Sequence, residues 1–131
     1  MSEIYITGAS RTPMGGFQGA LSDKAAPELG GDAIKAALEN AGVSGEAVEE
    51  LLMGCVLPAG LGQAPARQAG FQAGLKKETP ATTVNKVCGS GMKTVMLGHD
   101  AIKAGGPQLV VAGGMESMTN APYLSLSLIH I

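Results

Sequence analysis

The chain has 131 residues, enough for one domain and too few for two. Nine basic residues against eleven acidic ones give a net charge of -2, and no basic cluster is present, so we expect neither a nucleic acid nor a membrane surface as a partner. No apolar run approaches the ~20 residues of a membrane span. The first residues have no signal-peptide or transit-peptide pattern, so we expect a cytoplasmic protein with reduced thiols.

The first half of the chain predicts two strands and a helix between them. Residues 4–6 (IYI) form a short apolar run that predicts a strand. A helix is expected from Pro27, since proline is favoured in a first turn, to Gly42, since glycine often ends a helix. Residues 51–57 are a continuous apolar run, which is typical of a buried parallel strand.

The second half continues the alternation. Residues 64–75 and 89–104 predict helices, and residues 81–87 and 109–112 predict strands. The order is therefore β-α-β-α-β-α-β. Such an order indicates the α/β class, with a mostly parallel sheet between helices.

Cys88 stands between the strand of residues 81–87 and the helix of residues 89–104. At a helix N-terminus, unpaired backbone N–H groups and the helix dipole favour negative charge, which would make this sulfur more nucleophilic. Gly89 and Gly91 leave room for a planar acyl group beside it. From the residues alone two interpretations remain open: Cys88 is a nucleophile, or it is a small buried apolar residue, as free cysteines often are.

For Cys55 and His99 the sequence predicts structural roles. Cys55 lies within an apolar strand and is expected in the core. His99 lies on the apolar face of the last predicted helix, ~16 Å along the axis from Cys88, too far to act as its base. We expect it to be buried and hydrogen-bonded. His130 is given no role, and two cysteines with two histidines make a metal cluster improbable.

Several segments carry distinctive motifs in a fixed order. They are residues 8–15 (GASRTPMG), 53–60 (MGCVLPAG) with 62–68 (GQAPARQ), 84–93 (VNKVCGSGMK) and 111–123 (VAGGMESMTNAPY). Together they resemble the motifs of the thiolase family. The resemblance covers residues 3–124 and is closest to the biosynthetic branch, the acetyl-CoA acetyltransferases.

The resemblance implies acyl transfer between thioesters. Thiolases condense two acetyl-CoA molecules to acetoacetyl-CoA and free CoA, or run the reverse cleavage. The family nucleophile maps onto Cys88, whose sulfur is acylated and whose backbone N–H is one of two donors in the oxyanion hole. Coenzyme A thioesters are then substrates, with no bound cofactor or metal implied. A homodimer or tetramer is implied for the full-length protein, with residues 81–87 at the dimer interface; the CoA-binding residues stay unassigned.

The resemblance also implies that part of the catalytic set is missing. The family's activating His, its second Cys and a water-ordering Asn lie in a C-terminal half that has no counterpart here. We expect residues 1–120 to be an incomplete thiolase N-terminal domain. Residues 121–131 are expected to be the start of the loop domain and a tail unlike the family, and the chain to be an inactive fragment.

Two alternatives remain open at this point. One is a degradative 3-ketoacyl-CoA thiolase, because the choice of acyl chain length depends on the loop domain. The other is a dimerising half-domain without catalysis. A ketoacyl synthase shares the fold class and a Cys at a helix start, but residues 113–123 argue against it.

Overall fold

The structure is a computed structural model that describes residues 3–125. Residues 126–131, which include His130 and most of the expected tail, lie outside the described residues. The elements follow one another as α1 (Ala26–Ala41), η1 (Gly45–Ala47), β1 (Glu50–Gly54), α2 (Pro65–Gln72), β2 (Ala81–Val84), α3 (Ser90–Lys103), β3 (Val110–Gly114) and η2 (Met118–Asn120).

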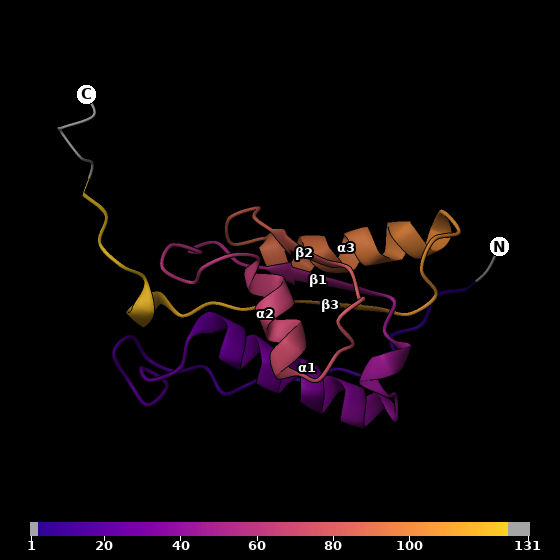
Figure 1. The fold of residues 1–131 in the computed structure, drawn as a ribbon, viewed down its shortest axis with the longest axis horizontal. Helices are drawn as coiled ribbons and strands as arrows, with labels where there is room; N and C mark the ends of the chain where they lie inside the picture. The colour runs from indigo at the N-terminus through magenta and orange to yellow at the C-terminus, as the bar shows by residue number, and fades with distance from the viewer. Residues whose placement is uncertain (1–2, 126–131) are drawn as a thin grey trace.

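The three strands form one parallel sheet in the order β2-β1-β3. In the register, Leu51 of β1 stands between Ala81 of β2 and Val111 of β3. Helix α3 covers one face of the sheet, and α2 with α1 covers the other (Figure 1). The α/β class with a parallel sheet between helices is therefore confirmed. Because the strands run in one direction, all three end at the same edge, on the left of Figure 1.

The core lies between the sheet and the pair α1 and α2. Strand β1 is central, and its side chains are buried from Leu51 onward, as its continuous apolar run predicted. Small residues let α2 approach closely, since a Cβ on Gly70 would lie 2.9 Å from the Cδ2 of Leu51. The buried cluster consists of Ala26, Ile34, Leu38, Val48, Leu51, Met53, Cys55, Ala66, Ala69, Leu75 and Met115.

Local signals set the bounds of α1 as expected. Pro27 lies in the first turn, and Glu28 accepts a hydrogen bond from the backbone nitrogen of Ala25 at 2.8 Å. Gly42 ends the helix at a φ of 66°, a left-handed conformation that glycine adopts without a Cβ clash. No helix in the described range 3–125 is long and apolar enough to cross a membrane.

The strand expected at residues 4–6 is not formed. Residues 3–16 carry no regular element, and the Tyr5 side chain is 71% exposed. This part of the chain runs beside α1, where Asn40 Nδ2 donates to the carbonyl oxygen of Ala9 at 3.0 Å. A strand needs a neighbouring strand to pair with, and this segment lies against a helix instead. The described sheet consequently has three strands, where the sequence predicted four.

Helix α3 turns a face of small residues to the sheet. Ser90, Thr94 and Gly98 are its buried residues, and a Cβ on Gly98 would lie 3.1 Å from Cγ1 of Val110. The close approach therefore requires small side chains. The larger side chains of the helix point away from the sheet: Met92 is 74% exposed, Val95 45% and Met96 50%.

His99 shares the outward face of α3, so the expectation of a buried histidine is wrong. Its side chain is 54% exposed, and Nδ1 lies 3.1 Å from Oδ1 of Asp100. Helical spacing correctly groups residues onto one face. It does not decide which of two opposite faces meets a sheet, because that depends on how closely the helix packs.

Candidate active site

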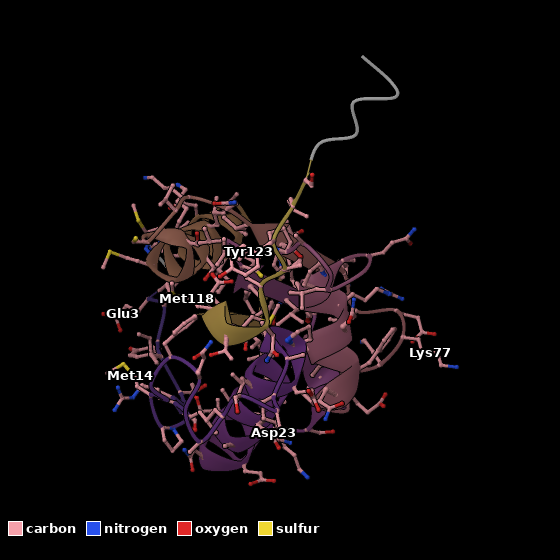
Figure 2. The ribbon with its side chains drawn as sticks, turned by 90° about the vertical axis from the view of Figure 1, so that its left-hand side faces the viewer. Glu3, Met14, Asp23, Lys77, Met118 and Tyr123 are labelled. Atoms are coloured by element: carbon pink, nitrogen blue, oxygen red, sulfur yellow. The ribbon has the colours of Figure 1, made fainter. Side chains whose placement is uncertain are left out.

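Three of the segments that resemble family motifs meet at the carboxyl edge of the sheet. Residues 55–57 follow β1, residues 85–89 follow β2 and residues 115–117 follow β3. In open parallel sheets, ligands bind at this edge. Figure 2 is turned so that this end faces the viewer, and it shows Met118 and Tyr123 there. The side chains of Met118 and Tyr123 are exposed.

Cys88 lies at this edge and is exposed. It follows β2 by four residues, and α3 begins two residues later at Ser90, with Gly89 as its N-cap at a φ of -88°. The structure thus places Cys88 at the strand-to-helix junction, with its side chain exposed in the described residues.

Val87, the residue before Cys88, has a φ of 50°. This left-handed conformation is unusual for a β-branched residue, because its Cβ crowds the backbone. Hydrogen bonds hold it from both sides. Its N–H donates to Oδ1 of Asn85 at 3.0 Å, and its carbonyl oxygen accepts from the N–H of Ser90 at 3.1 Å and from Ser90 Oγ at 2.6 Å.

Ser90 ties the turn together beneath Cys88. Its side chain is buried, and Oγ accepts from the backbone nitrogen of Lys86 at 2.8 Å while donating to Val87. The sequence alone predicts no such role for Ser90. Serine side chains often bond nearby backbone groups where the chain turns.

Glycines at the strand ends allow α3 to begin so close to the sheet. A Cβ on Gly54, the last residue of β1, would lie 2.7 Å from the carbonyl carbon of Ser90 and 2.8 Å from the nitrogen of Gly91. A Cβ on Gly114, the last residue of β3, would lie 3.1 Å from the Cα of Gly91. The backbone turn that carries Cys88 therefore rests directly on the ends of two strands.

Glu116 connects the segment after β3 to the segment after β1. Its Oε2 accepts from the N–H of Val56 at 2.9 Å, and its Oε1 accepts from the N–H of Leu57 at 3.1 Å. The thiol of Cys55 lies 3.7 Å from Oε1. Two backbone donors on one carboxylate fix both segments relative to each other.

Cys55 is a core residue, as predicted. It is 1% exposed, and burial, followed by the negative charge of Glu116 and the hydrogen bond to it, raises the pKa of its thiol to about 11. A neutral, enclosed thiol is a poor nucleophile at neutral pH. The two cysteines thus differ in accessibility in the direction that the sequence predicted.

Asn85 completes the contacts around this edge. Its Nδ2 donates to the carbonyl oxygen of Val56 at 3.3 Å, while its Oδ1 accepts from Val87. Asn85 and Glu116 lie within the segments that resemble family motifs, but the sequence alone predicts no role for either. The available signal for Asn85 was local, because asparagine side chains often bond the backbone two residues on. Nothing in the sequence around Glu116 indicated that its carboxylate would bind the backbone of Val56 and Leu57.

Other features of the described residues do not add to this site. A cavity of about 290 Å³ is lined by the start of α1, Gly60 and Gln68, and by none of residues 84–93. Within residues 3–125, no group of three His, Cys, Asp or Glu side chains is placed to hold a metal ion.

Comparison with known proteins identifies relatives of this chain. Residues 4–130 match the family model described as the thiolase N-terminal domain. Acetyl-CoA acetyltransferase of Xenopus tropicalis, named as mitochondrial, is 56% identical over 123 residues, or 94% of this chain and 29% of that protein. Acetyl-CoA acetyltransferase of Cupriavidus necator is 56% identical over 124 residues, or 95% of this chain and 32% of that protein. The chain spans about a third of the length of these relatives.

A solved structure agrees with the sequence relatives. The crystal structure of the Acat5 thiolase from Ascaris suum in complex with coenzyme A superposes with a TM-score of 0.91 and 41% sequence identity. The match covers 94% of this chain and 32% of that one. At this identity the likeness extends beyond the fold to the sequence itself.

The comparison overturns the expected cytoplasmic location. Relatives from Xenopus tropicalis, Xenopus laevis, Danio rerio and Mus musculus are named mitochondrial enzymes, so the expectation of a cytoplasmic protein does not stand. The expectation rested on the absence of a targeting pattern, and such an absence does not identify a compartment.

Proposed function

The chain belongs to the thiolase family, and on that premise we propose that it carries the nucleophile of an acetyl-CoA acetyltransferase, Cys88. The observation that carries the proposal is the position of this thiol: exposed, just before α3, at the carboxyl edge of a parallel sheet. The names of the relatives support acetyl-CoA rather than a longer acyl-CoA as the substrate.

In the proposed first half-reaction, the Cys88 sulfur attacks the thioester carbonyl of acetyl-CoA. The new carbon–sulfur bond forms as the carbonyl oxygen gains negative charge, and the carbon–sulfur bond to CoA then breaks. The thiol proton of Cys88 ends on the CoA thiol that leaves, so the products are acetyl-Cys88 and free CoA. Exchange of one thioester for another is close to balanced in energy, which suits a sulfur nucleophile.

The start of α3 supports this chemistry electrostatically. Backbone N–H groups at a helix N-terminus carry partial positive charge, and a preorganised donor of this kind stabilises a developing oxyanion. The resemblance to thiolases assigns one such donor to the backbone N–H of Cys88. Gly89 leaves that side open, since a Cβ there would have only one neighbour within 4 Å, the carbonyl oxygen of Lys86 at 3.5 Å.

The second half-reaction needs a base for the α-carbon of another acetyl-CoA. The histidine of the described range, His99, lies on the outward face of α3 and contacts Asp100, so it is not placed beside Cys88. We propose that these proton transfers use the family's C-terminal His and Cys, and that these 131 residues alone support acylation without condensation.

Two assembly features belong to the same proposal. Coenzyme A thioesters are the proposed substrates, supported by the coenzyme A bound to the Ascaris suum relative. A homodimer or tetramer is proposed for the full-length protein, with β2 at the interface. Strand β2 supports this because it pairs with β1 on one side and ends the described sheet on the other, which leaves one backbone edge unpaired.

The test is acetylation of the purified chain. Incubation with acetyl-CoA at neutral pH should release free CoA and add one acetyl group to the peptide that contains Cys88, as read by peptide mass mapping. Cys88→Ala should abolish both signals, and Cys55→Ala should leave them in place. An acetyl group on Cys55, or none on Cys88 in folded protein, would contradict the proposal.

A further inference from the structure

We propose that Asn85 and Glu116 are positioning residues for Cys88, which they hold in place through the backbone of Val87. The inference rests on the proposed role of Cys88 as the nucleophile, and it concerns how the fold fixes that thiol at the start of α3.

A continuous chain of hydrogen bonds crosses the carboxyl edge of the sheet. Glu116, after β3, accepts from the N–H of Val56, after β1, at 2.9 Å. The carbonyl oxygen of Val56 accepts from Nδ2 of Asn85, after β2, at 3.3 Å. Asn85 in turn accepts from the N–H of Val87 at 3.0 Å. The chain thus joins the ends of all three strands and finishes one residue before Cys88.

The conformation of Val87 needs such support. Its φ of 50° is sterically unfavourable for a β-branched residue. Its side chain is 65% exposed, so burial of that side chain does not hold the backbone in place. The hydrogen bonds to its N–H and carbonyl groups therefore hold Val87 at this positive φ. Asn85 supplies the first of them and Ser90 the second.

The dihedral angles of Val87 set the direction in which the chain enters Cys88. If Val87 relaxed to an ordinary negative φ, Cys88 would leave its place before α3. Ser90 would still be held in the first turn by the close contact of that turn with Gly54. Loss of the Asn85 bond should therefore displace the thiol without unfolding the helix.

The experiment measures the rate at which iodoacetamide alkylates Cys88 in the folded 131-residue chain. Asn85→Ala should slow alkylation severalfold, while circular dichroism and the urea midpoint show that the fold persists. Asn85→Ser should restore most of the rate, because a serine hydroxyl can also accept the N–H two residues on. Asn40→Ala is the matched control, since Asn40 also donates to a loop carbonyl, that of Ala9, but on α1.

A double-mutant cycle separates positioning from a general structural effect. Glycine adopts a positive φ without strain, so in a Val87→Gly background the added Asn85→Ala change should slow alkylation much less than it does in the native background. Glu116→Gln, which keeps the size and one acceptor oxygen, should slow alkylation by less than Asn85→Ala. A wild-type rate in Glu116→Gln would remove Glu116 from the proposal.

Two outcomes would overturn the role of Asn85. One is a wild-type rate in Asn85→Ala; the other is an equal loss in the native and Val87→Gly backgrounds. Alkylation does not require acyl transfer, so it is independent of the acetylation test. Failure of acetyl-CoA to modify Cys88, with the Asn85 effect intact, would refute the proposed function and leave the positioning in place.

Discussion

Gly54 and Ser90 touch backbone to backbone: a Cβ on Gly54 would lie 2.7 Å from the carbonyl carbon of Ser90. Gly54 ends β1, and Ser90 begins α3, so this contact sets the height of α3 above the sheet. The turn that carries Cys88 is held at the same height. Any side chain at position 54 must push this turn outward.

Gly54→Ala should therefore destabilise the fold. Forcing a methyl group against backbone atoms costs about 1–3 kcal/mol of unfolding free energy, because neither partner is a flexible side chain. Urea denaturation followed by circular dichroism measures the change. Gly89→Ala is the control from the same turn, since its φ is -88° and the new Cβ would lie 3.5 Å from the carbonyl oxygen of Lys86. Equal stability of the two variants would contradict this account of the contact.

The free energy of unfolding should fall at alkaline pH because of Cys55. Its pKa is raised from 9.0 to about 11 in the folded chain, so folding favours the neutral thiol. That contribution is fully present below pH ~9 and is lost as the pH rises through about 11, by an amount on the order of 2–3 kcal/mol.

The measurement compares urea denaturation of the wild type and Cys55→Ala between pH 8 and pH 11, a range of about three pH units around these pKa values. Lysines titrate in both proteins, so the difference between the two curves isolates the thiol. A difference that stays flat across this range would show that Cys55 ionises as easily in the folded chain as in the unfolded one.

Cys88 should react with iodoacetamide long before Cys55 does. Cys88 is exposed, whereas Cys55 is 1% exposed and remains neutral at pH 8. Limited labelling of the folded chain, then peptide mass mapping, gives the order. Labelling in urea should bring the two rates close together, because the burial that distinguishes them is then removed. Preferential labelling of Cys55 before unfolding would be incompatible with the described packing.

The exposed face of α3 should drive self-association of the chain. Met92, Val95 and Met96 form an apolar surface on a helix whose other face meets the sheet. Met96→Lys should reduce the concentration-dependent size seen by sedimentation velocity. It should change stability by less than about 0.5 kcal/mol, since the side chain is half exposed.

The control for Met96→Lys must leave the apolar surface of the chain unchanged. A change such as Lys35→Met would not serve, because it adds an apolar side chain on α1. Lys93→Arg on α3 keeps its charge and leaves the apolar residues in place, so it is the matched control and should associate like the wild type. If Met96→Lys associates as strongly as Lys93→Arg, contact through the unpaired edge of β2 becomes the better explanation.

Local sequence determined most of the element order and the position of Cys88. The turn residues Pro27 and Gly42 bound α1, and the continuous apolar run around Leu51 identified a strand buried on both faces. The position of Cys88 between a strand and a helix followed from the same local patterns. These signals act over a few residues, through backbone dihedral preferences and side-chain spacing, so they are readable in the chain itself.

Tertiary structure decided the features that depend on distant partners. The segment of residues 4–6 has strand-like residues but does not pair in the described sheet, and His99 faces outward because α3 packs through Gly98. The bond from Glu116 to Val56 joins residues 60 positions apart, and it exists only because parallel strands end at one edge. Which strands pair, which face of a helix meets the sheet and which distant residues form hydrogen bonds all depend on the surfaces that come together in the fold. The local preferences of a residue do not contain that information.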